Sequence, residues 1–408
     1  MHISLDSALG RQRRLNSVGE SVLQIAPNAA AAYSLRSLTG GDPKVVRVRR
    51  VIDNAESDFT AAGISSGALV NFVNDIQTVG TAVNGTGSFD NYTVSNLSNT
   101  GFSADNSAGG TGSAGFPYVF KDEDVLVIKY TVTNFSSTSS LSPAIRGVNN
   151  VNSVTGKTNA GTTFTANGTY TDTLTATADG THLMFADGNT GSYTISDFEI
   201  VSHSSNGFVE TWYDQSGNSN DVTQATAGSQ PKIVNAGFLV KVGSRASFKF
   251  DGSSDFLARA TYTQGELSQP NTFFSVAELD AYIDGNQKTY DGYQTPQRNM
   301  LQLNTAGNGQ FAHFGGIVAA TGEDADADRH LFTSLLNGAS SDLRIDGTSK
   351  TTADTSARGM IGIVIGANHN RLTDFWDGDI QEIIIYNSNQ SSTTPAVETN
   401  INSHYSIF

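Results

Sequence analysis

The strongest constraint on the fold is an alternation of side chains with a period of two residues. In DVLVIKYTVTNF (residues 124–135), Leu126, Ile128, Tyr130 and Val132 are all apolar, whereas the positions between them are mixed. Successive side chains of a β-strand point to opposite faces, so this segment predicts a strand with one face buried against a second sheet. Similar strands recur between turn-forming residues, which indicates a β-sandwich.

The composition favours the same fold class. Hydrophobic residues make up 38% of the chain and charged residues 15%, while Gly, Ser, Thr and Asn are abundant. Thr, Val, Tyr and Phe suit pleated surfaces, whereas Gly and Asn suit the turns between strands. The chain has no cysteine, which excludes disulfides and thiolate metal sites.

The length and a change of texture predict two domains. A chain of 408 residues exceeds one ordinary core. A block rich in Gly, Asn, Ser and Thr begins near residue 84, and the original texture resumes after Asn206. We therefore predict an all-β protein of two β-sandwich (jelly-roll) domains, one inserted in the other, with a short N-terminal arm. The predicted bounds are 1–28 for the arm, 29–83 and 206–408 for the outer domain, and 84–205 for the inserted domain.

The arm carries a helical stripe. Leu15, Val18, Val22 and Ile25 are spaced three, four and three residues apart, which places them on one face of a helix that Pro27 ends. Such a short helix is not stable alone and needs a partner surface. That surface belongs to the chain's own body, to another copy, or to another protein.

The charge is unevenly distributed. Residues 1–50 carry a net charge of +5, which leaves −20 for the rest of the chain. With Arg11, Arg13 and Arg14 in front of the helical stripe, the arm is predicted to anchor the chain to an acidic partner. The alternative is that Arg47, Arg49 and Arg50 account for part of this excess on a solvated strand face.

The total charge and the apolar segments exclude several functions. A net charge of −15 argues against nucleic-acid binding, which relies on Lys and Arg to neutralise phosphates. The start, MHISLDSALGRQRR, does not read as a secretory signal. The apolar run at residues 360–367 is too short to span a bilayer, so we expect no membrane insertion.

The stretch WYDQSGNSN (residues 212–220) combines one of two tryptophans with an acid, a serine and a glycine. Glycoside hydrolysis needs paired carboxylates, and this motif supplies Asp214 alone. A nucleophilic Ser216 has no histidine in a recognisable context. The structural interpretation is that Trp212 buries its ring, Asp214 caps the turn and Gly217 takes the unusual backbone angles.

Two acid-containing stretches raise the question of a cation. In FDGSSDF (residues 250–256), Asp251 and Asp255 offer hard oxygen ligands for calcium around a Gly/Ser turn. An Asx turn between two strands explains the same residues. In GEDADADRH (residues 322–330), four acids fall within six positions, and either a solvated loop or a cation site accounts for them. Apart from this calcium alternative, no cofactor is expected.

The stretch RLTDFWDGDIQEI (residues 371–383) places Trp376 between Asp374 and Asp377. An exposed aromatic ring beside acids stacks on a pyranose face while the carboxylates accept from sugar hydroxyls, so these three residues are a candidate carbohydrate site. The alternative is a closing strand whose Phe375 and Ile380 lie in the core. Further along, Pro395 marks the start of a helix with Val397, Ile401 and Tyr405 on one face.

Four stretches in order resemble a known family. AAYSLRSL with VVRVRRVIDNAESDF, GFVETWYDQSGNSNDVTQATAGSQPKIV, SFKFDGSSDFL and FWDGDIQEIIIYN together resemble concanavalin A-like (LamG-like) jelly-roll domains of bacteriophage virion proteins. The first two also resemble the start of the catalytic domain of B-type α-L-arabinofuranosidases, whose later catalytic region has no match here. Residues 84–205 are similar to carbohydrate-binding-module-like β-sandwiches of phage tail and fibre proteins.

The resemblance implies a bacteriophage virion structural protein, namely a decoration, fibre or tail-associated protein. On this view the chain is not an enzyme, is assembled into the virion in the host cytoplasm, and contacts other virion proteins of the capsid or tail. It would be a homo-oligomer that displays lectin-like modules for weak adhesion to a host surface glycan. The alternatives are a carbohydrate-binding bacterial protein and a glycoside hydrolase related to α-L-arabinofuranosidases.

Overall fold

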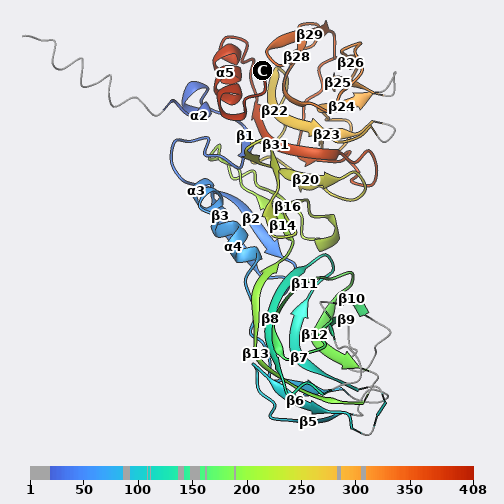
Figure 1. Cartoon of the computed structure of the whole chain (residues 1–408). Coiled ribbons are helices and arrows are strands. Elements are labelled where there is room, and N and C mark those ends of the chain that lie inside the picture. The colour runs from blue at the N-terminus through green and yellow to red at the C-terminus, as the bar shows by residue number, and fades with distance from the viewer. Residues whose placement is uncertain are drawn as a thin grey trace, which may run out of the picture.

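The chain folds into a larger and a smaller β unit joined at a narrow waist (Figure 1). The computed structural model describes residues 19–85, 92–107, 109–110, 112–136, 142–147, 157–160, 163–187, 190–282, 286–304 and 309–408. Strand makes up 46% of the structure and helix 10%, so the prediction of an all-β fold of β-sandwich architecture is confirmed. Within the described ranges, no helix is long and apolar enough to cross a membrane.

The larger unit is one closed network of antiparallel strands built from the two ends of the chain. Its strands are β1 (Ala31–Ser34), β2 (Lys44–Arg50), β3 (Glu56–Thr60), β14 (Gly207–Trp212), β15 (Val222–Thr223), β16 (Lys232–Asn235), β17 (Phe238–Leu239), β20 (Phe248–Asp251), β21 (Leu257–Arg259), β22 (Asn271–Leu279), β23 (Lys288–Gly292), β24 (Met300–Asn304), β25 (Gln310–Phe314), β26 (Val318–Ala320), β27 (Arg329–Leu336), β28 (Ser341–Ile345), β29 (Thr348–Ala353), β30 (Ile363–Ile365) and β31 (Asp377–Tyr386). A separate hairpin consists of β18 (Lys241–Val242) and β19 (Arg245–Ala246).

Strand β31 is central because it buries both of its faces. Ile383 and Ile385 point into the main core with Trp212 and Trp376, whereas Ile384 and Tyr386 point into a second core under helix α5 (Thr394–Tyr405). The alternation of a strand divides neighbouring residues between two cores in this way. Helix α5 follows the predicted pattern, with Val397, Ile401 and Tyr405 buried in that second core.

The short helix α2 (Val22–Ile25) packs on the chain's own body. Val22 is fully buried in the second core together with residues of β31 and α5. The prediction that Val22 serves as an anchor for another molecule is therefore wrong, because its side chain has no surface left to offer. Ile25 packs at the edge of the same core. The remaining predicted anchor residues, Arg11, Arg13, Arg14, Leu15 and Val18, lie outside the described residues.

The three arginines of β2 are engaged within the chain. Arg47 Nε lies 2.7 Å from an oxygen of Asp58, and Arg49, which is buried, donates to Gln230 Oε1 at 2.7 Å. Arg50 contacts two carboxylates of neighbouring loops. These residues therefore do not form a free basic strand face.

The smaller unit consists of two five-stranded antiparallel sheets. One sheet has the strand order β10-β9-β12-β7-β4 and the other β11-β8-β13-β6-β5. On β8 the apolar set Leu126, Ile128, Tyr130 and Val132 is fully buried, as the alternation predicts. The strands are β4 (Val83–Asn84), β5 (Thr93–Ser95), β6 (Phe102–Asp105), β7 (Gly112–Phe120), β8 (Val125–Thr133), β9 (Ser142–Gly147), β10 (Lys157–Ala160), β11 (Gly168–Thr175), β12 (Gly180–Asp187) and β13 (Ser192–Ser204).

Hydrogen bonds tie the two units together at the waist. Asn206, where the chain returns to the larger unit, donates to Glu123 Oε2 at 2.8 Å and accepts from the Ala236 N–H at 2.7 Å. Asn74, which follows helix α4 (Ala68–Val73), accepts from the Ser205 N–H at 3.0 Å. Helix α3 (Ala61–Ser65) and the 3-10 helix η3 (Ala227–Ser229) complete the larger unit.

Candidate functional site

The WYDQSGNSN motif is part of the framework of the fold. Trp212 is fully buried and meets the ring of Phe248 edge-on at 4.8 Å. Asp214 Oδ1 accepts from the N–H groups of Ala32 and Ser216, both at 2.8 Å. Its Oδ2 accepts from the Ser216 hydroxyl at 2.7 Å and from the Asn220 N–H at 3.0 Å. With four hydrogen bonds, this carboxylate is occupied in holding the turn.

Trp376 is not a sugar-stacking residue. Its ring is 1% exposed and belongs to the main core, so the prediction of a carbohydrate site on this ring is wrong. The flanking Asp374 lies 3.4 Å from Lys288 Nζ and accepts from Asn368 at 3.2 Å. Burial raises the pKa of the other flanking acid, Asp377. The aromatic-and-acid pattern marks the entry to the closing strand β31, which was the alternative interpretation. Ile380 lies in the main core as that interpretation expects, whereas Phe375 is only half-buried and is not among the residues of that core.

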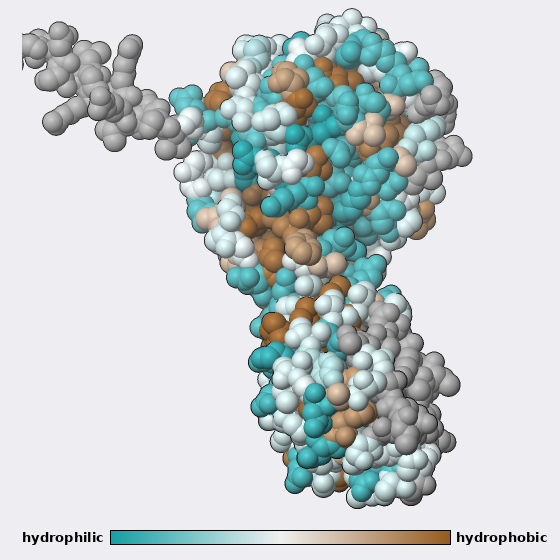
Figure 2. Space-filling model, in the orientation of Figure 1, coloured by the Kyte–Doolittle hydropathy of each residue, from teal (hydrophilic) through white to brown (hydrophobic). Residues whose placement is uncertain are grey.

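The largest cavity described lies on the larger unit beside the β16–β17 hairpin and has a volume of about 840 Å³. We call it the Phe238 cleft. Two aromatic side chains, Phe208 and Phe238, line it, and Figure 2 shows apolar surface gathered just above the waist, over the region where Figure 1 draws β2, β14 and β16. Its charged and amide-bearing walls include Gln230, Lys232, Lys249, Asp251, Asp255 and Asp379.

A tight turn presents Phe238 to solvent. Asn235 pairs with Phe238 across the hairpin, so Ala236 and Gly237 form a two-residue loop with φ angles of 46° and 85°. Positive φ at both positions is typical of the turn that matches the twist of a hairpin. Gly237 also lacks room for a side chain, because a Cβ there would lie 2.5 Å from Ser204 Cβ. The outcome is a phenylalanine that is 76% exposed.

The opposite wall contains two carboxyl groups in different protonation states. Asp251 accepts five hydrogen bonds from the turn that follows it, from the N–H groups of Ser253, Ser254 and Asp255 and from both serine hydroxyls. Burial works against its ionised form, but these donors hold the pKa of Asp251 at about 2. Burial and the nearby Asp251 charge raise the pKa of Asp255 to about 8.

The predicted calcium pair is thus an Asx turn at whose end one acid is neutral. A cation that used Asp251 would compete with its five hydrogen bonds, and Asp255 carries a proton at neutral pH. The arrangement instead places an ionised and a protonated carboxyl side by side in the wall of a cleft. Such a pair is suited to proton transfer as well as to hydrogen bonding with hydroxyl groups.

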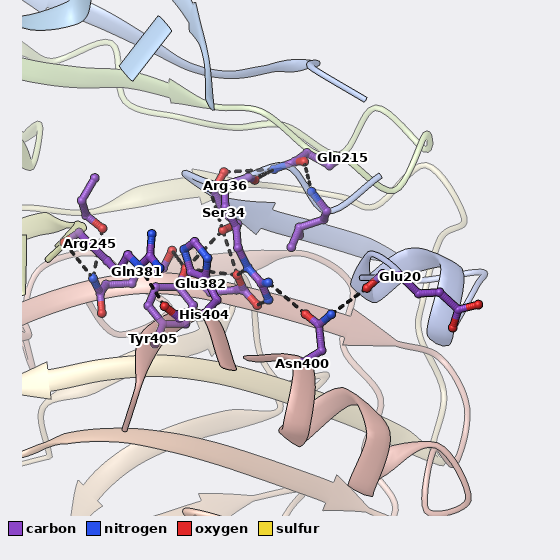
Figure 3. Close-up of polar contacts among 12 residues, drawn as sticks. Glu20, Ser34, Arg36, Gln215, Arg245, Gln381, Glu382, Asn400, His404 and Tyr405 are labelled. Carbon is purple, nitrogen blue, oxygen red and sulfur yellow. Dashed lines mark hydrogen bonds and ion pairs between the residues drawn. The ribbon is translucent and has the colours of Figure 1, made fainter. Parts of the chain in front are cut away.

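A second cavity of about 620 Å³ adjoins the Phe238 cleft, with which it shares Leu239 and Lys241. We call it the Arg36 pocket (Figure 3). Arg36 donates two hydrogen bonds to the Glu382 carboxylate, from Nε at 2.7 Å and from Nη2 at 2.9 Å. Glu382 is fully buried and also accepts from Ser34 at 2.8 Å.

The two buried charges beside the Arg36 pocket, Arg36 and Glu382, are paired with each other. Burial opposes the ionised form of Glu382, but Arg36 outweighs it and lowers the pKa of Glu382. Burial, followed by the Arg36 charge, lowers the pKa of His404 to about 4, so this imidazole is neutral. Arg36 further donates to Asn400, which donates to the Glu20 carbonyl at 2.7 Å (Figure 3). The network ties β1, β31, α5 and Glu20, two residues before α2, together.

Most residues that define the cleft are not among the site residues predicted from the sequence. Phe208, Phe238, Lys249 and Asp379 come from four strands, and no single short motif contains all of them. The signal present in the sequence is Gly237, which indicates a turn after Ala236 and is followed directly by the aromatic residue Phe238. Of the predicted site residues, Asp251 and Asp255 reach the cleft, whereas Asp374, Trp376 and Asp377 are not among the residues that line it.

No known protein-family profile matches the chain, and no curated protein matches it either. Solved structures do match, at low identity. A Trypanosoma rangeli sialidase in complex with 2,3-difluorosialic acid has a TM-score of 0.35 and 12% identity, and the match covers 48% of this chain and 31% of the sialidase. The chain therefore spans about a third of the length of that enzyme.

Two further matches cover more of the chain. A candidate carbohydrate-binding protein from Bacteroides ovatus has a TM-score of 0.30 and 11% identity over 71% of this chain and 78% of its own. An α-L-arabinofuranosidase soaked with 4-nitrophenyl α-L-arabinofuranoside has a TM-score of 0.34 and 14% identity over 69% of this chain and 62% of its own.

These matches correct one prediction. Because the matched folds include a sialidase and an arabinofuranosidase, the expectation that the chain is not an enzyme is wrong as an inference from its fold. The matched structures are β-sandwich folds, which is consistent with the jelly-roll part of the family resemblance.

Proposed function

We propose that this chain is a glycan-binding protein and that its sugar site is the Phe238 cleft. The observation that carries the proposal is an aromatic ring, 76% exposed, beside a cavity of about 840 Å³ whose walls carry carboxyl, amide and ammonium groups. A sugar ring has an apolar C–H face and a rim of hydroxyl groups. An exposed ring suits the first, and convergent polar groups suit the second.

The wall offers both donors and acceptors to such a rim. Lys232 Nζ lies 3.0 Å from the Asn235 amide oxygen and 3.3 Å from Glu123 of the smaller unit, so the smaller unit borders the cleft. Gln230 is buried and held by Arg49, which fixes its orientation. Asp255, whose pKa is about 8, keeps a proton at neutral pH that a sugar oxygen can accept, whereas the oxygens of Asp251 are held by the turn.

A glycan array followed by calorimetry tests this proposal. We expect Phe238→Ala to weaken binding of the best glycan roughly tenfold, because the stacking surface is lost. Leu372→Ala is the matched control, since Leu372 is a hydrophobic residue of the same unit with 75% exposure and is not among the cleft's lining residues. Equal binding by wild type and Phe238→Ala would place the sugar site elsewhere.

We further propose that this site is displayed on a bacteriophage particle by a homo-oligomeric structural protein. Support comes from the sequence resemblance and from the basic start of an otherwise acidic chain. Many copies on one particle make weak sites effective. Full-length protein and protein lacking residues 1–18 are compared for co-sedimentation with particles that lack this protein. Sedimentation of the full-length form alone supports an anchoring role, and equal sedimentation of both forms contradicts it.

A second candidate function is glycoside hydrolysis, and the Asp251–Asp255 pair favours it. A glycosidase needs one carboxyl that keeps a proton for the leaving oxygen and a second that stays ionised. The pKa of about 8 for Asp255 and of about 2 for Asp251 meet that requirement within one cleft. Release of reducing sugar from array hits, measured for wild type and Asp255→Asn, separates hydrolysis from binding alone.

A further inference from the structure

A group of three carboxylates lies at one end of β22 and β31, beside the Phe238 cleft. Glu278 on β22 and Asp379 on β31 are directly opposite each other in the strand register. Asp280 follows Glu278 by two residues, so the two project from the same side of the chain. Lys249 on β20 is opposite Asp379 from the other side. One row of charged side chains therefore crosses three neighbouring strands.

The spacing of these carboxylates suits a single cation. One oxygen from each of Glu278, Asp280 and Asp379 lies within 4.8 Å of the other two. Calcium binds oxygen at about 2.3–2.6 Å, so oxygens on opposite sides of one ion are separated by about 5 Å. The three side chains can reach one calcium ion with no movement of the backbone.

A second observation points to a missing partner. The side chain of Asp379 is 8% exposed, and its buried Oδ1 has no hydrogen-bond partner among the described residues. The other oxygen, Oδ2, receives Lys249 Nζ at 3.0 Å. Burial of an unpaired carboxylate oxygen is unfavourable, so native structures normally supply a donor or a metal for it.

The charge of the group is also incompletely balanced. Lys249, which contacts both Asp379 and Asp280, contributes one positive charge against three carboxylates. Arg329 is opposite Glu278 in the register and its charge favours the ionised form of Glu278, but its guanidinium donates to the carbonyls of Val242 and Tyr405 and not to a carboxylate of the group. Among the described ion pairs, Lys249 is the cation that serves this group.

We propose that Glu278, Asp280 and Asp379 form a calcium site and that the Lys249 ammonium takes the place of the ion when calcium is absent. Calcium accepts six to eight oxygen ligands, so water or other oxygens complete its shell. Asp379 and Lys249 also line the Phe238 cleft, which places the ion within reach of a bound ligand. That last link rests on the proposed glycan function, whereas metal binding itself does not.

Isothermal titration of EDTA-treated full-length protein with calcium chloride, without any sugar, tests the site. We expect one calcium per chain in wild type and at least tenfold weaker binding in Asp280→Asn, because Asp280 is an exposed ligand whose loss leaves the core intact. Lys249→Gln removes the competing ammonium and is expected to bind calcium more tightly. Asp328→Asn is the control, since it removes an exposed acid of the 322–330 loop.

Three results would overturn the proposal. The absence of calcium binding in both wild type and Lys249→Gln would make Lys249 a permanent counter-ion. Wild-type affinity in Asp280→Asn would place calcium elsewhere. Loss of binding in Asp251→Asn, with Asp280→Asn unaffected, would assign the ion to the FDGSSDF turn. Glycan binding is measured separately in EDTA and in calcium, so failure of the sugar site does not hide the outcome for the metal.

Discussion

The Arg36 pocket and the Phe238 cleft adjoin each other and differ in how completely their polar groups are paired. In the Arg36 pocket, a fully buried glutamate has an arginine fork and a serine hydroxyl as partners. In the Phe238 cleft, a phenylalanine is exposed, an aspartic acid keeps its proton and Asp379 Oδ1 has no partner among the described residues. Complete pairing stabilises a fold, whereas incomplete pairing leaves groups available to a ligand.

Removal of Arg36 gives the largest expected effect. The change Arg36→Met leaves Glu382 as an unpaired buried charge, and we expect the free energy of unfolding at pH 7 to fall by about 3–5 kcal/mol. Urea denaturation measures the loss. The double variant Arg36→Met with Glu382→Gln is the control, because it removes the charge and should recover part of the stability. A loss below about 1 kcal/mol in the single variant would show that the pair is not structural.

The pH dependence of the same pair has a definite sign. Arg36 lowers the folded-state pKa of Glu382, so the pair's contribution to stability is present above the pKa of an unfolded glutamate, about 4.3. The contribution is lost as the pH falls from that value through the folded-state pKa.

Asp255 is expected to change the stability with pH in the opposite direction to Glu382. Its replacement should have the second largest effect on the free energy of unfolding. Its folded pKa of about 8 exceeds the unfolded value of about 3.9, so the folded state binds the extra proton between these pH values. Stability from this group is full below pH 4 and declines as the pH rises toward 8. We expect Asp255→Asn to be more stable than wild type at pH 8 by roughly 2–4 kcal/mol, and the difference to shrink toward pH 4.

Urea denaturation of wild type and Asp255→Asn at several pH values measures this difference. Ser254→Ala is a useful comparison, because it removes one of the donors to Asp251 and leaves Asp255 in place. A constant difference between wild type and Asp255→Asn from pH 4 to 8 would mean that Asp255 titrates normally and cannot serve as an acid in the cleft.

Much of the framework could be predicted from the sequence because strand alternation is local. The buried set on β8, the turn under Asp214 and the apolar face of α5 all depend on neighbours within a few residues. The burial of Trp376 could not be predicted from the sequence, because it depends on a main core that distant strands assemble. The exposure of Phe238 could not be predicted for the converse reason, because a large apolar residue at the start of a strand is normally expected in the core.

The row of Glu278, Asp379 and Lys249 shows the same limit for a site. The three residues are spread over 131 positions of the sequence between 249 and 379 and come together through strand register alone. A single sequence shows that each segment is a strand but does not specify the pairing order. The acid-rich runs at residues 250–256 and 322–330 attracted attention because their acids are close in sequence, which is a weaker criterion than closeness across a sheet.

Replacement of Lys241 has the smallest expected effect on stability. It tests whether one bound ligand occupies both the Phe238 cleft and the Arg36 pocket. Its side chain is exposed, lines both cavities and has no ion-pair partner among the described residues. We expect Lys241→Gln to leave the free energy of unfolding within about 0.5 kcal/mol of wild type, as for most surface changes.

If a bound glycan extends from the Phe238 cleft into the Arg36 pocket, Lys241→Gln weakens the binding of acidic glycans more than that of neutral ones. The difference shrinks as salt is added, because salt screens an exposed charge. Calorimetry with one acidic and one neutral array hit at low and high salt measures both. An equal effect on the two sugars would confine the ligand to the Phe238 cleft and leave the Arg36 pocket as a purely structural neighbour.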